Sequence, residues 1–159
     1  MPFAPAKPLV VCSLALLWIA LAAGPGAEAQ AQRTSLCVTA ARANLRAGPG
    51  MKNRITWEVH KYMPLVQVGS EGDWIKVKDV DGDLHWIFKR LVDSSIACVT
   101  VSAPRANIRK GPGVKFGKWF TVERYTSFKK LDQQGGWVKL EWEGQEMWVY
   151  QTLVWDGSN

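Results

Sequence analysis

The chain is poor in the residue types from which most enzyme and metal sites are built. It has two histidines and three cysteines among 159 residues, and it contains no C-x-x-C or H-x-x-x-H spacing that would indicate a structural zinc site. The glycine-rich segments at 48–50 and 111–113 lack the G-K-[ST] ending of a phosphate-binding loop. The sequence therefore predicts no catalytic residue, no metal and no cofactor, and it favours a protein that is not an enzyme.

The chain also has no block of like charges and no long helical pattern. The 20 basic and 14 acidic residues give a net charge of +6, and both signs are mixed along the chain without a basic tail or block. Nucleic acid is therefore not an expected partner. No segment keeps a helical spacing of apolar residues beyond one turn, which favours an all-β fold.

The first residues have the order of a secretory signal peptide. Lys7 precedes an apolar run of 15 residues at 9–23, and Ala27-Glu28-Ala29 follows in A-x-A form. An uncleaved membrane anchor is the alternative, but a spanning helix needs about 20 apolar residues. We expect a signal peptide at 1–29 cleaved near Ala29, then a disordered lead-in at 30–35. The mature protein would be periplasmic or secreted, with no stable membrane insertion.

The rest of the chain is a tandem repeat. Residues 42–50 read R-A-N-L-R-A-G-P-G and residues 105–113 read R-A-N-I-R-K-G-P-G, at an offset of 63. Farther along, Tyr62 recurs as Tyr125, and Trp74-x-Lys76 recurs as Trp137-x-Lys139. Such self-similarity predicts two copies of one small domain. We place the first at 36–93 and the second at 97–156.

Within each copy, short runs rich in β-branched and aromatic residues predict strands separated by glycine-containing turns. Because a flat sheet of this size would leave its edges and one apolar face exposed, we expect each copy to close into a small, partly open barrel. The expected strands are 37–39, 55–59, 65–68, 74–78 and 86–88 in the first copy, and 98–101, 119–122, 128–131, 137–142 and 148–150 in the second.

Each repeat resembles a bacterial SH3 domain of the SH3b group. The resemblance rests on N-x-R-x-G-P-G at 44–50 and 107–113, on G-x-W-x-K-[VL] at 72–77 and 135–140, and on the later W-[IV] steps. It implies an SH3-like barrel in an exported, non-catalytic recognition module. Characterised members of this family direct cell-wall lytic enzymes to peptidoglycan peptides.

Two departures from the family pattern bear on the ligand. His85 and Met147 stand where the family has glycine in its G-W-V step, so a less tightly turned backbone is expected there. Leu91 and Leu153 stand where eukaryotic SH3 domains place a groove tyrosine. Binding of P-x-x-P peptides in the eukaryotic manner is therefore not expected.

Polar residues that could carry chemistry lie in the first copy without counterparts in the second. His60 and His85 align with Glu123 and Met147, which favours solvent-facing strand histidines over a thiol–histidine pair with Cys37. Asp79, Asp81 and Asp83 alternate around Gly82 but lack the rest of a twelve-residue calcium loop. A solvated hairpin tip is the expected structure of that segment.

Two cysteines follow the signal segment, and each opens a repeat. In an oxidising compartment Cys37 and Cys98 form a candidate disulfide between the repeats. The alternative is two buried free thiols, one in each core. Both interpretations remain open at the level of sequence.

The aromatic residues carry the functional signal. Trp74 and Trp137 share a strand face with lysines and are expected to lie partly toward solvent, whereas core packing is expected for Trp86 and Trp148. Trp119 and Trp142 have no aromatic counterpart in the first copy. Tryptophan is enriched in binding patches because it buries a large area.

The candidate ligand-binding residues are therefore Trp74, Trp137, Trp119 and Trp142. The favoured function is an exported module that recognises peptidoglycan or another cell-envelope peptide. The alternative is a periplasmic structural or assembly protein, in which the additional tryptophans seal an interface between the barrels or with a partner protein. The sequence does not define the oligomeric state.

Overall fold

The described part of the chain consists of strands joined by turns and two short 3-10 segments. The computed structural model describes Met1 and residues 34–158. The expected signal peptide and its cleavage site near Ala29 lie outside these residues, apart from Met1. Among the described residues, no helix is long and apolar enough to span a membrane.

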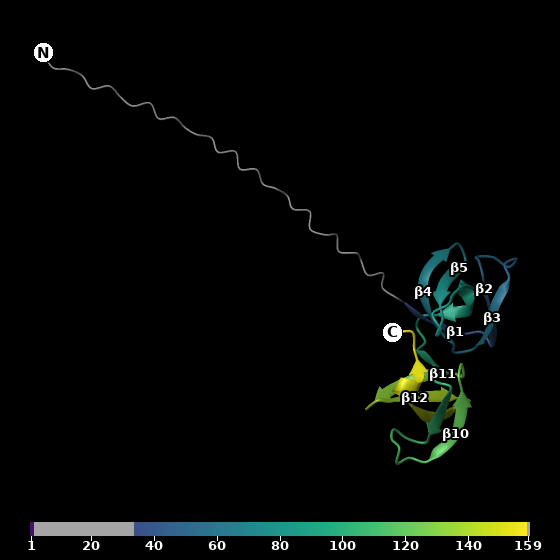
Figure 1. The fold of residues 1–159 in the computed structure, drawn as a ribbon, viewed down its shortest axis with the longest axis vertical. Coiled ribbons are helices and arrows are strands. Elements are labelled where there is room, and N and C mark those ends of the chain that lie inside the picture. The colour runs from purple at the N-terminus through teal and green to yellow at the C-terminus, as the bar shows by residue number, and fades with distance from the viewer. Residues whose placement is uncertain (2–33, 159) are drawn as a thin grey trace. The chain divides into compact units, whose positions relative to one another are not determined.

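The first repeat forms one antiparallel sheet of seven strands, called barrel one here. Its strand order is β3-β2-β6-β5-β4-β1-β7, and Figure 1 shows strands β1 to β5 curling around a common centre. The elements are β1 (Ser35–Val38), β2 (Arg42–Arg46), β3 (Ile55–His60), β4 (Pro64–Glu71), β5 (Trp74–Lys78), β6 (Leu84–Phe88), η1 (Lys89–Leu91) and β7 (Val92–Asp93).

The second repeat forms barrel two with the same connectivity. Its order is β10-β9-β13-β12-β11-β8-β14, which is the order of barrel one advanced by seven strands. The prediction of an all-β fold with two small barrels is confirmed. The elements are β8 (Cys98–Val101), β9 (Arg105–Arg109), β10 (Lys118–Glu123), β11 (Ser127–Gln134), β12 (Trp137–Trp142), β13 (Gln145–Tyr150), η2 (Gln151–Leu153) and β14 (Val154–Trp155).

Strands β2 and β9, which carry the repeated R-A-N-[LI]-R segment, are missing from the expected strands. Their apolar members alternate with polar ones, and Ala43, Leu45, Ala106 and Ile108 are buried. Alternation of this kind is a strand pattern, but two arginines and an asparagine in five residues hide it. The expected lead-in at 30–35 also ends too late, because Ser35 opens β1.

Each barrel has its own core at equivalent positions. Buried residues common to both cores include Val38, Leu45, Leu65, Val77 and Ile87 in barrel one, and Val101, Ile108, Phe128, Leu140 and Val149 in barrel two. The prediction of core packing for Trp86 and Trp148 is wrong, because Ile87 and Val149 occupy the inward positions of β6 and β13 and the neighbouring tryptophans point outward, half-buried.

Bulges recur at matching places and help each sheet to curl. The register of β4 against β5 shifts between Gln67 and Gly69, and that of β11 against β12 shifts between Lys130 and Asp132. An extra residue on one strand bends it and increases its twist. The two copies therefore have a β-bulge at the same position of the repeat.

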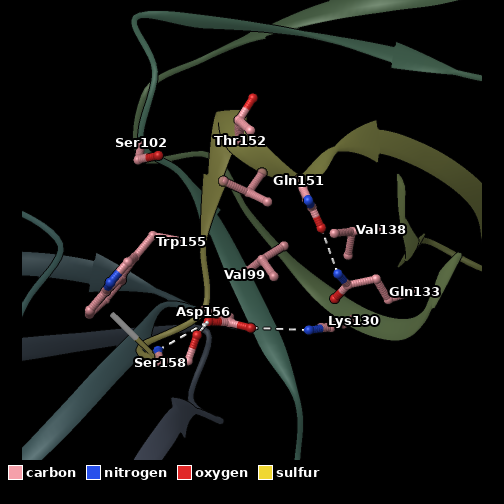
Figure 2. A pocket seen from close by; sticks show the side chains of 11 residues that line it. Val99, Ser102, Lys130, Gln133, Val138, Gln151, Thr152, Trp155, Asp156 and Ser158 are labelled. Carbon is pink, nitrogen blue, oxygen red and sulfur yellow. Dashed lines mark hydrogen bonds and ion pairs between the residues drawn. The ribbon is translucent and has the colours of Figure 1, made fainter. Parts of the chain in front are cut away.

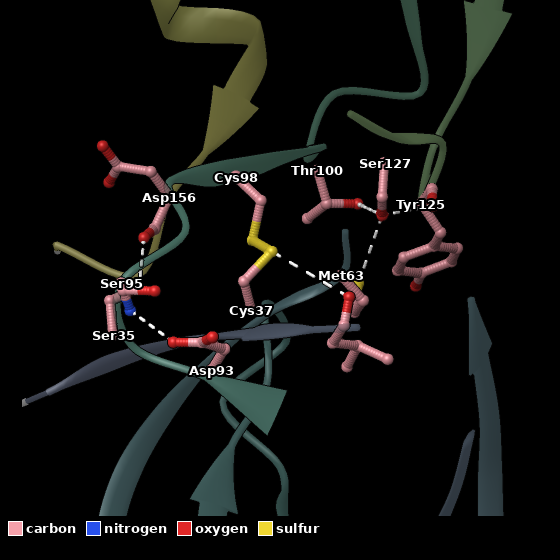
Figure 3. Close-up of a disulfide and its surroundings, with 11 residues drawn as sticks. Ser35, Cys37, Met63, Asp93, Ser95, Cys98, Thr100, Tyr125, Ser127 and Asp156 are labelled. Atoms are coloured by element: carbon pink, nitrogen blue, oxygen red, sulfur yellow. Dashed lines mark hydrogen bonds between the residues drawn. A yellow bond between two sulfur atoms is a disulfide. The ribbon is translucent and has the colours of Figure 1, made fainter. Parts of the chain in front are cut away.

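A disulfide joins the barrels. Cys37 in β1 and Cys98 in β8 are bonded, with Cα atoms 6.0 Å apart and a sequence separation of 61 (Figure 3). By strand register Cys37 corresponds to Thr100 and Cys98 corresponds to Ser35, so the bond joins positions that are two residues apart in the repeat. Other contacts accompany it: Ser35 Oγ donates to the carbonyl of Asp156 at 2.8 Å, and Ser127 Oγ lies 3.5 Å from Met63 Sδ.

Candidate functional site

A groove on barrel one contains the first of the expected tryptophans. Trp74 begins β5, and its cross-strand partner in β6 is Phe88, whose ring centroid lies 5.6 Å from that of Trp74. Both rings are half-buried. The groove has a volume of about 530 Å³ and is lined by Arg42, Ala43, Asn44, Arg46, Met51, Trp74, Phe88 and Leu91.

The two arginines of this groove have different roles. Arg46 is 9% exposed, and its Nη1 donates to the carbonyl of Asn53 at 2.7 Å, which fixes the turn that carries the G-P-G segment. Arg42 is largely exposed and lies 3.9 Å from Glu58, which is also exposed. A pair of this kind contributes little to stability. The Arg42 guanidinium is therefore available to an anionic ligand, and apolar surface lies beside it.

Barrel two has the matching aromatic pair. Trp137 and Tyr150 are cross-strand partners with ring centroids 5.3 Å apart, and the Arg109 guanidinium lies 6.0 Å from the centre of the Trp137 ring. Arg109 also donates to the carbonyl of Phe116 at 2.9 Å. The aromatic pair and the arginine are thus retained, in the same relation as Trp74, Phe88 and Arg46.

Trp119 and Trp142 lie elsewhere in barrel two. Their rings flank Phe120, with centroid distances of 5.5 Å and 6.2 Å, and the tryptophans are 43% and 46% exposed. Trp137 and Trp142 occupy opposite ends of β12. The structure therefore brings Trp119 and Trp142 together but separates them from Trp137, and Trp74 belongs to the other barrel.

A buried polar cluster in barrel one corrects the expectation for its loop. His85 is 8% exposed and Asp79 is 3% exposed, so His85 is not solvent-facing and the hairpin tip is only partly solvated. His85 Nε2 lies 3.0 Å from Asp79 Oδ2, and Thr56 Oγ1 lies 2.7 Å from His85 Nδ1. His60, the other histidine, is exposed as expected.

Strand register shows what replaces this cluster in barrel two. Val77 pairs with His85 and Leu140 pairs with Met147, so Met147 is the counterpart of His85 and packs in the second core. By the same register Trp142 replaces Asp79 and Trp119 replaces Thr56. The polar cluster of barrel one is thus an apolar, partly exposed cluster in barrel two.

The barrels also meet through a turn of barrel two. Arg124 and Tyr125 lie between β10 and β11, and both contact Asp81 of barrel one: Arg124 Nη2 is 2.6 Å from Oδ1, and the Tyr125 hydroxyl donates to Oδ2 at 2.9 Å. The Tyr125 ring packs edge-on against Trp57 at 5.2 Å. The recurring tyrosine was visible in the sequence, but its partner Asp81 lies 44 residues away.

This contact predicts a pH effect at alkaline pH. The hydrogen bond to Asp81, then burial, raises the pKa of Tyr125 above 10.0, because ionisation removes the donor and creates a second negative charge. A raised pKa means that the contribution to stability is complete below pH 10 and is lost as the pH rises through the folded-state value. In an Asp81→Asn variant we expect Tyr125 to ionise at lower pH, as followed by phenolate absorbance. A Tyr125→Phe variant identifies the transition, and identical titrations with and without Asp81 would contradict the assignment.

A second hollow of about 480 Å³ lies in barrel two beside β14, and several of its polar side chains are paired with one another (Figure 2). Lys130 Nζ is 3.0 Å from Asp156 Oδ2, and Gln133 Nε2 donates to Gln151 Oε1 at 2.7 Å. Burial acts to raise the pKa of Asp156, but hydrogen bonds from Ser158 and Lys130 outweigh it and hold that pKa below 3.8. The charged groups of this hollow are therefore paired with each other, whereas Arg42 of the Trp74 groove is largely exposed.

The comparison with protein families agrees with the duplicated fold. Residues 39–94 and residues 104–154 each match the family described as "Bacterial SH3 domain". The chain belongs to the bacterial SH3 family. It carries two of these domains in tandem, and such domains are a type of cell-wall-binding module.

Among curated proteins, the chain is similar to "Putative N-acetylmuramoyl-L-alanine amidase YrvJ" of Bacillus subtilis (strain 168). The two are 25% identical over 126 residues, which cover 73% of this chain and 24% of the relative. The chain thus spans about a quarter of that protein's length.

Among solved structures, similar chains include NlpC1 from Trichomonas vaginalis, with 16% identity and a TM-score of 0.37, and an NlpC/P60 family protein from Bacillus cereus ATCC 10987, with 14% identity and a TM-score of 0.36. The matches cover 87% and 76% of this chain, and 50% and 55% of those chains. Similarity at TM-scores this low does not support a functional assignment.

The curated relative contradicts the prediction that the protein is not an enzyme, because that relative is named as an amidase. The prediction came from the scarcity of histidine and the absence of a repeated acid–base pair. Residue counts of this kind describe the composition of the two repeats. They do not determine whether the protein has an enzymatic activity.

Proposed function

We propose that the tandem domains bind peptidoglycan in the cell envelope, and that the Trp74 groove of barrel one recognises the wall peptide. Binding of this kind would keep a cell-wall hydrolytic activity next to the peptidoglycan that it cleaves. The observation that carries the proposal is the groove itself, where a half-buried tryptophan and phenylalanine lie beside an exposed guanidinium. The amidase relative supports the choice of substrate, because its name specifies the bond between the glycan and the peptide of the wall.

The chemistry of the groove suits a short acidic peptide. Peptides of the bacterial wall carry methyl side chains and free carboxylates, and the groove offers apolar surface from Phe88, Met51 and Leu91. Arg42 supplies a cation at its edge, and a guanidinium binds a carboxylate through paired hydrogen bonds. Binding pockets are commonly apolar with a few polar groups that fix orientation.

Replacing Trp74 should remove most of the binding. A tryptophan at the centre of a binding site typically contributes 2 kcal/mol or more, so we expect Trp74→Ala to weaken binding about 30-fold. The measurement is co-sedimentation of the protein with purified peptidoglycan sacculi over a range of sacculus concentrations.

The matched control is Trp119→Ala, which removes an exposed tryptophan of barrel two, away from the groove. It should be retained on sacculi like the unsubstituted protein. Arg42→Gln should weaken retention while leaving the fold intact, because Arg42 is exposed. Equal retention of Trp74→Ala and Trp119→Ala on sacculi would show that the Trp74 groove is not the binding site.

A further inference from the structure

Residues 34–158 contain two equivalent turns. One of them, Arg124-Tyr125, forms hydrogen bonds with the other barrel. Lys61-Tyr62 between β3 and β4 matches Arg124-Tyr125 between β10 and β11. The tyrosines have φ values of 69° and 68°, and their backbone N–H groups donate to Val38 and Val101 at 2.8 Å and 2.9 Å. In each turn the cation lies over the tyrosine ring, at 5.0 Å and 5.1 Å. The turns are therefore alike in conformation and chemistry.

The surfaces opposite these turns are also equivalent. Barrel one receives Arg124 and Tyr125 on Asp81 and Trp57. In barrel two the aligned residues are Glu143, which precedes Gly144 as Asp81 precedes Gly82, and Phe120, which has the strand register of Trp57. We call Phe120, Trp142 and Glu143 the Glu143 face. It keeps a carboxylate, which in barrel one pairs with Arg124, and an aromatic ring, which in barrel one packs against Tyr125.

The Glu143 face remains open in this structure. It borders a groove of about 990 Å³ whose lining includes Lys61 and Tyr62 on one side and Glu141, Trp142 and Glu143 on the other. Within residues 34–158, no ion pair joins Lys61 to Glu143. Trp142 stands where barrel one has Asp79, and it is 46% exposed.

We propose that this groove is a second binding site, which takes a segment of a partner protein presenting a basic side chain next to an aromatic one. The occupant is inferred from barrel one, where the equivalent face already holds an arginine–tyrosine pair. Glu143 would accept hydrogen bonds from the cation, and a cation over the exposed Trp142 ring adds a favourable cation–π interaction. The site lies between two domains, which is a common place for ligands.

Three carboxylates at the groove favour a basic occupant. Glu123, Glu141 and Glu143 line it. Glu123 pairs loosely with exposed Arg105 at 3.7 Å, and Glu141 pairs with Lys129 at 3.4 Å. Glu143 is the carboxylate that no basic side chain of the described residues approaches within 4 Å. Two cations also line the groove: Arg124 is held by Asp81, and Lys61 lies over the Tyr62 ring.

The test uses a capped tetrapeptide, acetyl-Ala-Arg-Tyr-Ala-amide, titrated into the isotope-labelled protein. NMR follows the indole N–H resonance of Trp142, which is assigned by its loss in Trp142→Ala. We expect this resonance to shift on addition of the peptide, and Glu143→Gln to weaken the peptide affinity about tenfold, because a charge-assisted hydrogen bond is lost. The analogue with glutamine in place of arginine should bind about tenfold more weakly to the unsubstituted protein.

Trp74→Ala is the matched control, because it alters the other groove and should leave this affinity unchanged. Equal binding of the arginine and glutamine peptides would overturn the proposal, as would an unchanged affinity in Glu143→Gln. A shift of the Trp142 resonance with protein concentration alone, without peptide, would show that a second copy occupies the face and would also overturn it. Loss of peptide binding in Trp74→Ala would assign the peptide to the Trp74 groove instead.

Discussion

Replacing both Cys37 and Cys98 with alanine is expected to lower the free energy of unfolding by about 4 kcal/mol. The disulfide closes a loop with a sequence separation of 61 residues, and in the chain-entropy treatment a loop of that length restricts the unfolded chain by about this amount. Alanine is preferable to serine, because the cysteines are 0% and 4% exposed and a serine hydroxyl would be buried. Small domains bury a limited fraction of their surface, so this loss is a large part of their stability.

The measurement is urea denaturation followed by tryptophan fluorescence, with and without a thiol reductant. The reductant should shift the midpoint of the unsubstituted protein toward that of the double-alanine variant, whose own midpoint should not respond. An unsubstituted protein that unfolds at the same urea concentration with and without reductant would contradict the expected stabilisation.

The sequence was sufficient for the architecture because the repeat supplies each observation twice. Strands at 74–78, 98–101 and 137–142 have the expected bounds. The first and third alternate between apolar and charged residues over most of their length and follow glycine-containing turns, and the second is a short run of β-branched and apolar residues. The strands that were missed, β2 and β9, bury only two small or medium apolar residues each. A five-residue segment that is mostly polar has too weak a period to be recognised from sequence alone.

The interactions between segments could not be predicted from residue spacing. Asp79 and His85 face inward because β5 and β6 pair in the register that places His85 beside Val77, and a histidine opposite a buried valine has to find polar partners. Likewise, Asp81 meets Arg124 through the packing of two barrels. Such pairs depend on tertiary contacts, whereas the half-buried position of Trp74 followed from the alternation of one strand.

Asp79→Ala is expected to destabilise barrel one by about 3 kcal/mol. Asp79 Oδ1 accepts the backbone N–H groups of Asp81 and Asp83, each at 2.9 Å, and Oδ2 lies 3.0 Å from His85 Nε2. An ionised carboxylate only accepts hydrogen bonds, so Nε2 donates and Nδ1 is left to Thr56. Removing the carboxylate loses two turn bonds and leaves a buried ring N–H without its partner, and an unsatisfied buried donor alone costs about 1–3 kcal/mol.

The matched control is Asp83→Ala in the same hairpin. Asp83 is exposed, and its contacts with Asp79 are made by its backbone, so its loss should change stability by less than about 0.5 kcal/mol. Asp79→Asn should lie between the two, because one side-chain oxygen remains to accept the turn N–H groups. Urea denaturation of the three variants gives the comparison. Equal midpoints for Asp79→Ala and Asp83→Ala would mean that the buried cluster contributes nothing to stability.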